Sequence, residues 1–414
     1  MTTFGLIACC LCIAAAGTEV PKSLSRSEAT AAVDATVKRI ADRSRAERAA
    51  ELKSGVLTVA GARMPIWATQ FGPKSKDGTR PLWISMHGGG GAPAQVNDQQ
   101  WDNQKQLYQP AEGVYVAPRA PSNEWNLWHQ APVDQLFERL IEDLVICERV
   151  DPDRVYLMGY SAGGDGVYQL APRMADRFAA ASMMAGHPND ARPEGLRNLP
   201  FAIHVGGTDG AFDRNKVAAQ WGVMLDALAQ SDPGAYVHQV EVHAGKGHWM
   251  DREDASAVPW MAKYTRNARP QKVVWLQDDV THPRFYWLVV DEPKPGQRIV
   301  ATRQGQEINI VEAPSGLALR ILLDDAMLDL DKDVRVTQGD KELFVGRVPR
   351  SKAVIERTLQ ERFDPKAAFT AEVQVVTAAT TVVAPVVPAA LATPAAPAAP
   401  ATRAAPAPAA PATR

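Results

Sequence analysis

The serine in the stretch Gly-Tyr-Ser161-Ala162-Gly has the surroundings of a nucleophile. An almost entirely apolar run, residues 154–159, precedes it, and residues compatible with a helix follow. In a Gly-x-Ser-x-Gly turn between a strand and a helix, small neighbours tolerate the strained backbone that exposes the hydroxyl. The Ala162 N–H, at the start of the helix, would face the charge that develops on an attacked carbonyl. Since this pattern arises by chance in roughly one chain in ten of this length, other residues must decide.

A serine hydroxyl needs a general base and an acid that orients the base. Two aspartates, Asp209 and Asp213, follow the apolar run at 201–205. Asp209 is the favoured acid because it comes directly off the predicted strand, with an ordinary turn residue as the alternative. Asp213 is placed to cap a helix that begins near Asn215.

The base is sought in the stretch "EVHAGKGHWM", which contains two histidines. His243 falls in an alternating strand pattern and reads as a half-buried strand residue. His248 lies in the loop beyond that strand, with Gly245 and Gly247 before it, and is the favoured base. The chain order is then Ser161, Asp209, His248, which is typical of one hydrolase fold.

A second oxyanion donor is expected from the glycine loop "SMHGGGG" at residues 85–91. Glycines let the backbone approach a substrate closely, and a His-Gly-Gly loop aims an N–H at the carbonyl oxygen. Gly88 and Gly89 are both candidates, and the sequence does not choose between them. His87 is expected to brace the loop. A phosphate-cradling loop is disfavoured because no Lys-Ser/Thr follows and no Gly-x-Gly-x-x-Gly spacing is present.

Three tryptophans are candidates for the substrate pocket. Trp125 and Trp128 stand in "SNEWNLWHQ" after a predicted strand, and Trp249 follows His248. Stiff rings in loops suit an aromatic or sugar acyl ester, but tryptophan also packs loops onto cores, and both interpretations stay open.

Strands that alternate with helices predict a mostly parallel α/β sheet, in which function collects at the carboxyl ends of the strands. The glycine loops and both acid and base candidates follow such strands. The helical periodicity is clearest over residues 134–150 and 215–230. The catalytic α/β domain is expected over residues 55–267, after an N-terminal helical segment at 18–54.

Beyond residue 268 the pattern changes to closely spaced strands with Gly, Asp and Pro turns. This predicts a small antiparallel, sandwich-like β domain over 268–376, with one helix near 353–363. Asp329, Asp331 and Asp333 have the spacing of a calcium loop, but Val334 occupies the position that needs glycine, so no metal site is predicted. The Ala/Pro-rich residues 377–414 are expected to be an extended, disordered tail.

Composition and the N-terminus bear on location and partners. The net charge is −2, which gives no basic field for nucleic acid. The apolar run at 4–16 is too short to span a bilayer and precedes small residues, so residues 1–17 read as a signal peptide, although the basic n-region is missing. We therefore expect a secreted or periplasmic protein without a membrane span. Three of the four cysteines fall in this leader, which excludes a disulfide framework in the mature chain.

Together the motifs "DPDRVYLMGYSAGG" and "HGGGG" resemble the α/β-hydrolase superfamily, and most of all secreted esterases related to polyhydroxybutyrate depolymerases and feruloyl esterases. The resemblance covers about residues 55–262. It implies an α/β-hydrolase fold, a Ser161–His248–Asp209 triad, carboxylic ester hydrolysis through an acyl-enzyme, and no cofactor.

Two other functions remain under consideration. A peptidase of the prolyl oligopeptidase type also carries Gly-x-Ser-x-Gly-Gly, but such enzymes usually add a large N-terminal β domain, and only about 50 residues precede the first strand here. The other is a non-catalytic scaffold that contacts an envelope or polymer through the C-terminal β domain and tail.

Overall fold

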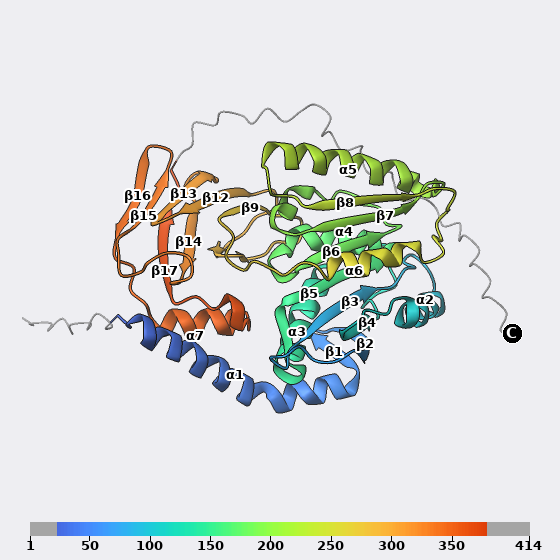
Figure 1. The fold of residues 1–414 in the computed structure, drawn as a ribbon, viewed down its shortest axis with the longest axis horizontal. Coiled ribbons are helices and arrows are strands. Elements are labelled where there is room, and N and C mark those ends of the chain that lie inside the picture. The colour runs from blue at the N-terminus through green and yellow to red at the C-terminus, as the bar shows by residue number, and fades with distance from the viewer. Residues whose placement is uncertain (1–22, 379–414) are drawn as a thin grey trace, which may run out of the picture.

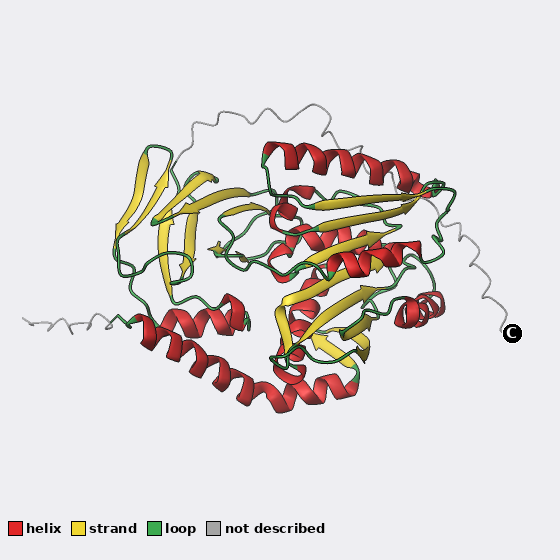
Figure 2. Ribbon diagram, in the orientation of Figure 1, coloured by secondary structure: helices red, strands yellow, loops and turns green. Residues whose placement is uncertain are grey.

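A large mixed sheet forms the centre of the computed structural model, which describes residues 23–378 (Figures 1 and 2). The strand order is β1-β2-β4-β3-β5-β6-β7-β8. All pairings from β4 onward in this order are parallel, whereas β1 and β2 pair antiparallel with their neighbours. The strands are β1 (Val56–Val59), β2 (Ala62–Phe71), β3 (Arg80–Met86), β4 (Gly113–Pro118), β5 (Val150–Tyr160), β6 (Ala180–Met184), β7 (Phe201–Gly206) and β8 (His238–His243).

Helices cover both faces of this sheet. Successive residues of a strand point to opposite sides, so strands with apolar residues at every position must be covered on both faces. In β3, Leu82 and Ile84 join a core with helices α3, α4 and α5. Trp83 between them faces the other side, where it stacks on Tyr156 with ring centroids 4.2 Å apart and shares a core with α6. The helices are α1 (Arg26–Ser54), α2 (Ala94–Leu107), α3 (Ala131–Glu148), α4 (Ala162–Arg173), α5 (Arg214–Ser231), α6 (Ala257–Met261) and α7 (Lys352–Glu361). The predicted fold class, an α/β-hydrolase fold, is confirmed.

Helix α2 was not predicted, and its composition explains why. Its fully buried residues, Asn97 and Gln104, are both polar, so no apolar stripe marks the helix in the sequence. The helix lies near the carboxyl ends of β3 and β4 (Figure 1).

Two smaller sheets follow the α/β part, as a four-stranded sheet β10-β11-β14-β17 and a five-stranded sheet β16-β15-β13-β12-β9. Their strands are β9 (Lys272–Leu276), β10 (Arg284–Phe285), β11 (Leu288–Val289), β12 (Arg298–Gln304), β13 (Glu307–Glu312), β14 (Ala318–Leu323), β15 (Val334–Gln338), β16 (Lys341–Gly346) and β17 (Ala371–Val376). The predicted boundary at residue 267 falls between α6 and β9.

Three details of this β region differ from the sequence analysis. The strand pattern predicts the run "RFYWLVVDE" as one strand, but Tyr286 has a φ of 54° and turns the chain between β10 and β11. The pairing of β13 with β15 is parallel, so the region is not wholly antiparallel. Strand β17, after α7, was not predicted.

The β region packs against the end of the large sheet at which the parallel strands begin. There Asp364 accepts hydrogen bonds from Arg177 and Arg266, at 2.8 Å and 2.6 Å, and all three side chains are buried. Arg266 also binds Asp153 near the start of β5. Figure 1 shows the two smaller sheets on the left, away from the carboxyl ends of β3 to β8 on the right.

Helix α1 runs along the outside of both regions (Figure 1). Arg26 at its start pairs with Asp325 and Asp329 of the β region, and Arg48 near its end pairs with Glu142 and Asp143 of α3. The helix therefore links the two parts through ion pairs at its two ends.

The predicted signal peptide, residues 1–17, lies outside the described residues, as does nearly all of the predicted tail. Among residues 23–378, no helix is long and apolar enough to cross a membrane.

Candidate active site

Ser161 stands on the sharp turn between β5 and α4, with φ 57° and ψ −120°. L-residues other than glycine rarely adopt this conformation. A Cβ on Gly159 would lie 2.3 Å from the Gly163 carbonyl oxygen, and one on Gly163 would lie 2.2 Å from that of Met86. The two flanking glycines are therefore required for the tight packing of this turn. Ser161 occupies the N-cap position of α4 without using its hydroxyl as a cap, which leaves Oγ available.

The structure brings the three predicted triad residues into contact. Ser161 Oγ lies 2.9 Å from His248 Nε2, and His248 Nδ1 lies 2.8 Å from Asp209 Oδ2. The Asp209 side chain is 1% exposed and that of His248 is 43% exposed. A buried carboxylate therefore holds an accessible imidazole with one nitrogen turned toward the serine hydroxyl.

Contacts between the loops after β7 and β8 fix the acid and the base. Thr208 donates its N–H to the Lys246 carbonyl oxygen at 2.9 Å, and a Cβ on Gly206 would lie 2.0 Å from the Gly247 carbonyl oxygen. The Tyr160 hydroxyl donates to the carbonyl oxygen of His248. These interactions bring the Asp209 and His248 loops together above the turn at Ser161.

The glycine loop lies directly beside the serine. A Cβ on Gly88 would lie 3.1 Å from Ser161 Cβ, and Gly89 has a φ of 103°. The Gly90 N–H is already bound by Asn97 Oδ1 at 2.8 Å. The Gly88 and Gly89 N–H groups are left as the loop's candidate oxyanion donors, next to the Ala162 N–H in the first turn of α4. The geometry keeps both glycines as candidates.

His87 braces this loop from beneath, as expected. Its Nδ1–H donates to the Gly88 carbonyl oxygen at 2.6 Å, and its Nε2 accepts the Ala120 N–H at 3.1 Å. Burial lowers the pKa of His87 to about 4, so the ring is neutral at physiological pH.

The three tryptophans do not share one role. Trp125 and Trp249 are 57% and 46% exposed, on the loop beside Gly91 and next to His248. Trp128 is fully buried, and its Nε1–H donates to the His87 carbonyl oxygen at 2.9 Å. The prediction that Trp128 lines the substrate site is therefore wrong, because its ring supports the glycine loop from inside the core.

The alternative acid and base lie in different surroundings. Asp213 occupies the N-cap position of α5 without a side-chain cap, contrary to expectation, and pairs with Lys216 at 2.7 Å. His243 contacts His204 and Glu253 at 3.1 Å and 3.2 Å.

Two residues near the site were not singled out from the sequence. Phe212, 59% exposed, follows Asp209 and adds a third accessible ring to these loops. Asp165, on the first turn of α4, accepts the His187 N–H, and burial raises its pKa to about 6. An aspartate in the otherwise small and apolar stretch "AGGDGVY" was the available signal for a buried acid.

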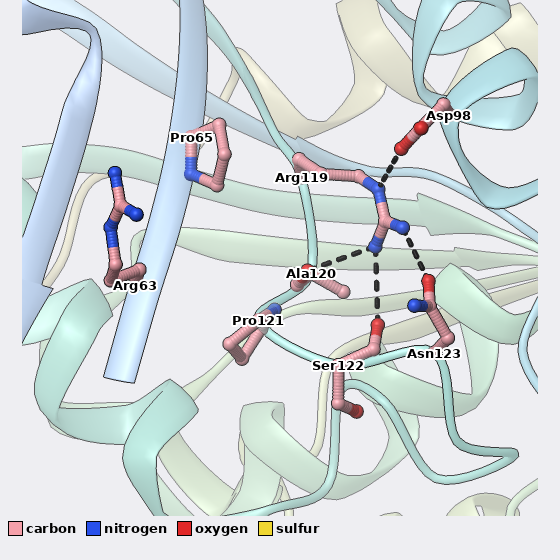
Figure 3. Close-up of a pocket in the computed structure, with 8 residues that line it drawn as sticks. All are labelled: Arg63, Pro65, Asp98, Arg119, Ala120, Pro121, Ser122 and Asn123. Atoms are coloured by element: carbon pink, nitrogen blue, oxygen red, sulfur yellow. Dashed lines mark hydrogen bonds and ion pairs between the residues drawn. The ribbon is translucent and has the colours of Figure 1, made fainter. Parts of the chain in front are cut away.

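A hollow of about 300 Å³ opens at the carboxyl end of β4 (Figure 3). Arg119 in its wall donates to Asp98, to the Ala120 and Ser122 carbonyl oxygens, and to Asn123. The guanidinium thus ties α2 to the loop that carries Trp125.

The acidic residues of the calcium-like stretch pair with basic side chains. Asp329 contacts Arg26 and Lys332, and Asp331 contacts Arg350. Within the part of the chain that the structure describes, no group of three or more His, Cys, Asp or Glu residues could hold a metal ion.

Known proteins resemble parts of this chain. No family model matches the chain. A curated protein named "Putative esterase NocK", from Nocardia uniformis subsp. tsuyamanensis, is 30% identical over an alignment of 131 residues, and the match covers 28% of this chain and 37% of that protein. The chain thus matches little more than a third of that relative's length.

Solved structures with a similar arrangement include a thermostable esterase, at 18% identity and a TM-score of 0.40, covering 51% of this chain and 62% of that one. Another is LpqC, a poly(3-hydroxybutyrate) depolymerase from Bordetella parapertussis, at 17% identity and a TM-score of 0.37, covering 50% of this chain and 86% of that one.

Proposed function

We propose that this α/β-hydrolase-fold protein is a serine esterase that cleaves carboxylic esters through an acyl-enzyme. The observation that carries the proposal is the continuous contact from Ser161 Oγ through the His248 ring to the buried Asp209 carboxylate. That order of nucleophile, base and orienting acid is what activation of a serine hydroxyl requires.

In the first half of the reaction, His248 Nε2 takes the Ser161 proton while Oγ attacks the ester carbonyl carbon. The carbonyl oxygen becomes an oxyanion facing the N–H groups of Ala162 and of Gly88 or Gly89. When the intermediate collapses, the bond to the alcohol oxygen breaks and His248 gives its proton to that oxygen. The alcohol leaves and the acyl group remains on Ser161.

In the second half, His248 takes a proton from water, and the resulting hydroxide attacks the acyl carbonyl. The bond to Ser161 Oγ then breaks, His248 returns the proton to Oγ, and the acid leaves. Asp209 holds the ring with Nδ1 protonated and stabilises the imidazolium formed in each half. No step calls for a cofactor.

Three exposed rings favour esters with a flat or apolar portion. Trp125, Trp249 and Phe212 come from loops next to the glycine loop, the base and the acid. Aromatic rings at an accessible site bind planar or sugar groups without much loss of side-chain freedom. A panel of short acyl, feruloyl, acetyl-sugar and polyester substrates identifies which of these the rings select.

The test is turnover of p-nitrophenyl esters by the purified protein. Ser161→Ala should lose about 10⁴-fold or more in kcat, while Ser231→Ala, at the exposed end of α5, should match the wild type. If Ser161→Ala hydrolyses as fast as the wild type, the proposal fails. If wild-type activity on peptide amides exceeds that on esters, the peptidase alternative replaces it, and failure of a fluorophosphonate probe to label Ser161 favours the scaffold alternative.

Export is a further part of the proposal and rests on the apolar run before residue 17. Mature protein recovered outside the cytoplasm should begin shortly after this run when its N-terminus is sequenced. For the C-terminal part, the hypothesis is that the β region contacts a polymer or the cell envelope. Pull-down of the protein with the polymeric esters of the panel tests this.

A further inference from the structure

We propose that Asn97 is the positioning residue of the oxyanion loop, setting the direction of its N–H donors without touching substrate. The inference deepens the proposed esterase function and rests on it. It comes from a buried amide on helix α2, which the sequence did not reveal as an element.

The Asn97 side chain is fully buried beneath the glycine loop and uses both of its polar atoms. Oδ1 accepts the Gly90 N–H at 2.8 Å. Nδ2 donates to the Ala92 carbonyl oxygen at 3.0 Å and to Asn123 Oδ1 at 3.1 Å. A buried amide with these partners has little freedom to rotate, because each lost bond leaves an unpaired polar group away from water.

The loop backbone is shaped around this amide. Gly89, Gly90 and Gly91 all have positive φ, and a Cβ on Gly89 would lie 2.2 Å from Asn97 Oδ1. In a trans peptide the C=O and N–H groups point in opposite directions. Holding the Gly90 N–H therefore turns the Gly89 carbonyl oxygen away from Asn97. It also fixes the peptide plane next to the one that carries the Gly89 N–H, and the Gly88 N–H lies one plane further along the loop.

The amide is itself held by a second set of contacts. Arg119 donates through Nε to Asp98, the neighbour of Asn97 on α2, at 2.8 Å, and through its terminal nitrogens to the Ala120 and Ser122 carbonyl oxygens and to Asn123 (Figure 3). Asn123, which orients the Asn97 amide, is thereby fixed to the same helix. Without these contacts of Arg119 and Asn123, the glycine loop would have several backbone conformations of similar energy.

Preorganised donors matter most when charge develops on the substrate oxygen. Loosening the loop should therefore affect the transition state more than the bound ester. Asn97→Leu, which keeps the volume but removes every hydrogen bond, should lower kcat about 10- to 100-fold with KM changed less than about threefold. Its affinity for a boronic acid that forms a tetrahedral adduct with Ser161 should fall by a factor close to that in kcat/KM.

Asn123→Ala provides a milder variant, since Asn123 is exposed and its loss leaves Asn97 in place. We expect a drop of about three- to tenfold in both kcat and boronate affinity. Asn103→Leu, on the exposed face of α2, is the matched control and should behave as the wild type. The pH dependence of kcat/KM should keep its shape in all variants, because Asn97 acts on the donors and not on His248.

A folded Asn97→Leu protein with wild-type kcat overturns the inference, as does a change confined to KM. If Asn97→Leu does not fold, wild-type boronate affinity in Asn123→Ala overturns it instead. The outcomes are distinct from failure of the esterase proposal, in which the wild type itself lacks activity that depends on Ser161.

Discussion

Asp209 and His248 differ sharply in their exposure to solvent. The carboxylate is 1% exposed and the imidazole 43% exposed. A charge pair interacts more strongly where water is excluded on one side. In the proposed reaction, the positive charge that the ring gains during attack is therefore stabilised from its buried side, while the side that would meet substrate stays accessible.

This arrangement predicts the effect of removing the charge of the acid. Asp209→Asn keeps the size of the side chain but lets its amide donate to Nδ1, which favours the wrong ring tautomer. We expect kcat for ester hydrolysis to fall about 10³- to 10⁴-fold near neutral pH. The measurement is steady-state turnover with a circular dichroism check of folding.

Asp213→Asn is the matched control, because Asp213 is a nearby aspartate whose side chain pairs only with exposed Lys216. It should retain wild-type turnover within about twofold. Equal losses in both variants would mean that the loop, and not the acid, is responsible.

At the scale of elements, α1 and α3 enclose an aspartate in an unfavourable position. Asp143 is buried and lies 3.3 Å from Arg48, but Arg48 also contacts Glu51 and Glu142. Burial, together with the charge of Glu51, raises the pKa of Asp143 to about 8, and Arg48 opposes this shift only in part.

The raised pKa predicts a pH dependence of stability. A carboxyl group whose pKa rises from about 4 in the unfolded chain to about 8 in the folded one stabilises the fold fully below pH 4. That contribution is lost as the pH rises toward 8. Asp143→Asn has no proton to lose, so it should gain stability relative to the wild type between pH 4 and pH 8, by more than about 1 kcal/mol, or a few degrees in Tm.

Thermal unfolding of both proteins across this pH range measures the effect. Asp42→Asn, on the exposed side of α1 where Asp42 pairs with Lys38, serves as the control and should follow the wild type within about 0.5 kcal/mol. A constant difference between Asp143→Asn and the wild type at every pH would contradict the prediction.

Which elements could be predicted depended on the pattern of their buried residues. Helix α3 buries Leu136, Phe137, Leu140, Ile141 and Leu144, which recur at helical spacing and predict it clearly. Helix α2 buries Asn97, which binds the glycine loop, and Gln104, which donates to Ser85 of β3. Such bonds leave no periodic signal. The position of Trp128 could not be predicted either, since only tertiary packing decides whether a loop tryptophan faces the substrate site or the core.

Ser161, Asp209 and His248 could be predicted because the proposed roles of nucleophile, acid and base demand particular residue types after particular strands. Their mutual distances were not predictable, since they depend on how the loops after β7 and β8 pack on each other. Asn97 could not have been singled out, because one asparagine in a polar stretch has no distinguishing spacing.

At the scale of the whole molecule, the β region lies where the parallel strands of the large sheet begin (Figure 1). Ser161, Asp209 and His248 follow the opposite, carboxyl ends of β5, β7 and β8. The buried Asp364 joins the β region to the α/β part through Arg177, 187 positions away, and Arg266. These neighbours hold the pKa of Asp364 well below its usual range. Contacts between residues so far apart in the chain produce no local sequence pattern. The surface on which the β region packs against the large sheet could therefore not be predicted.

Asp364→Asn should therefore lower the stability of the fold and leave the esterase activity unchanged. Removing one partner of a buried ion network costs about 3–5 kcal/mol. The loss should shrink below pH 4, where the carboxyl group of the unfolded wild-type chain begins to take up a proton while the folded chain keeps it ionised. The denaturant midpoint should fall, while kcat and KM for ester hydrolysis by the folded protein at low temperature stay within about twofold of the wild type.

Asp333→Asn, which breaks an exposed pair with Arg347, is the control for charge and should change the midpoint little. A large change in KM for Asp364→Asn, with folding intact, would show that the β region influences the substrate site after all.

The backbone of Ser161, with φ 57° and ψ −120°, sets two selective pressures against each other. Such a conformation costs about 1–3 kcal/mol for any residue with a side chain, and glycine alone adopts it freely. Heat resistance would favour glycine at this position, whereas the proposed reaction requires the hydroxyl. A lineage that keeps the serine accepts a less stable turn for as long as the reaction is useful, and a lineage that loses the reaction has a physical reason to lose the serine as well.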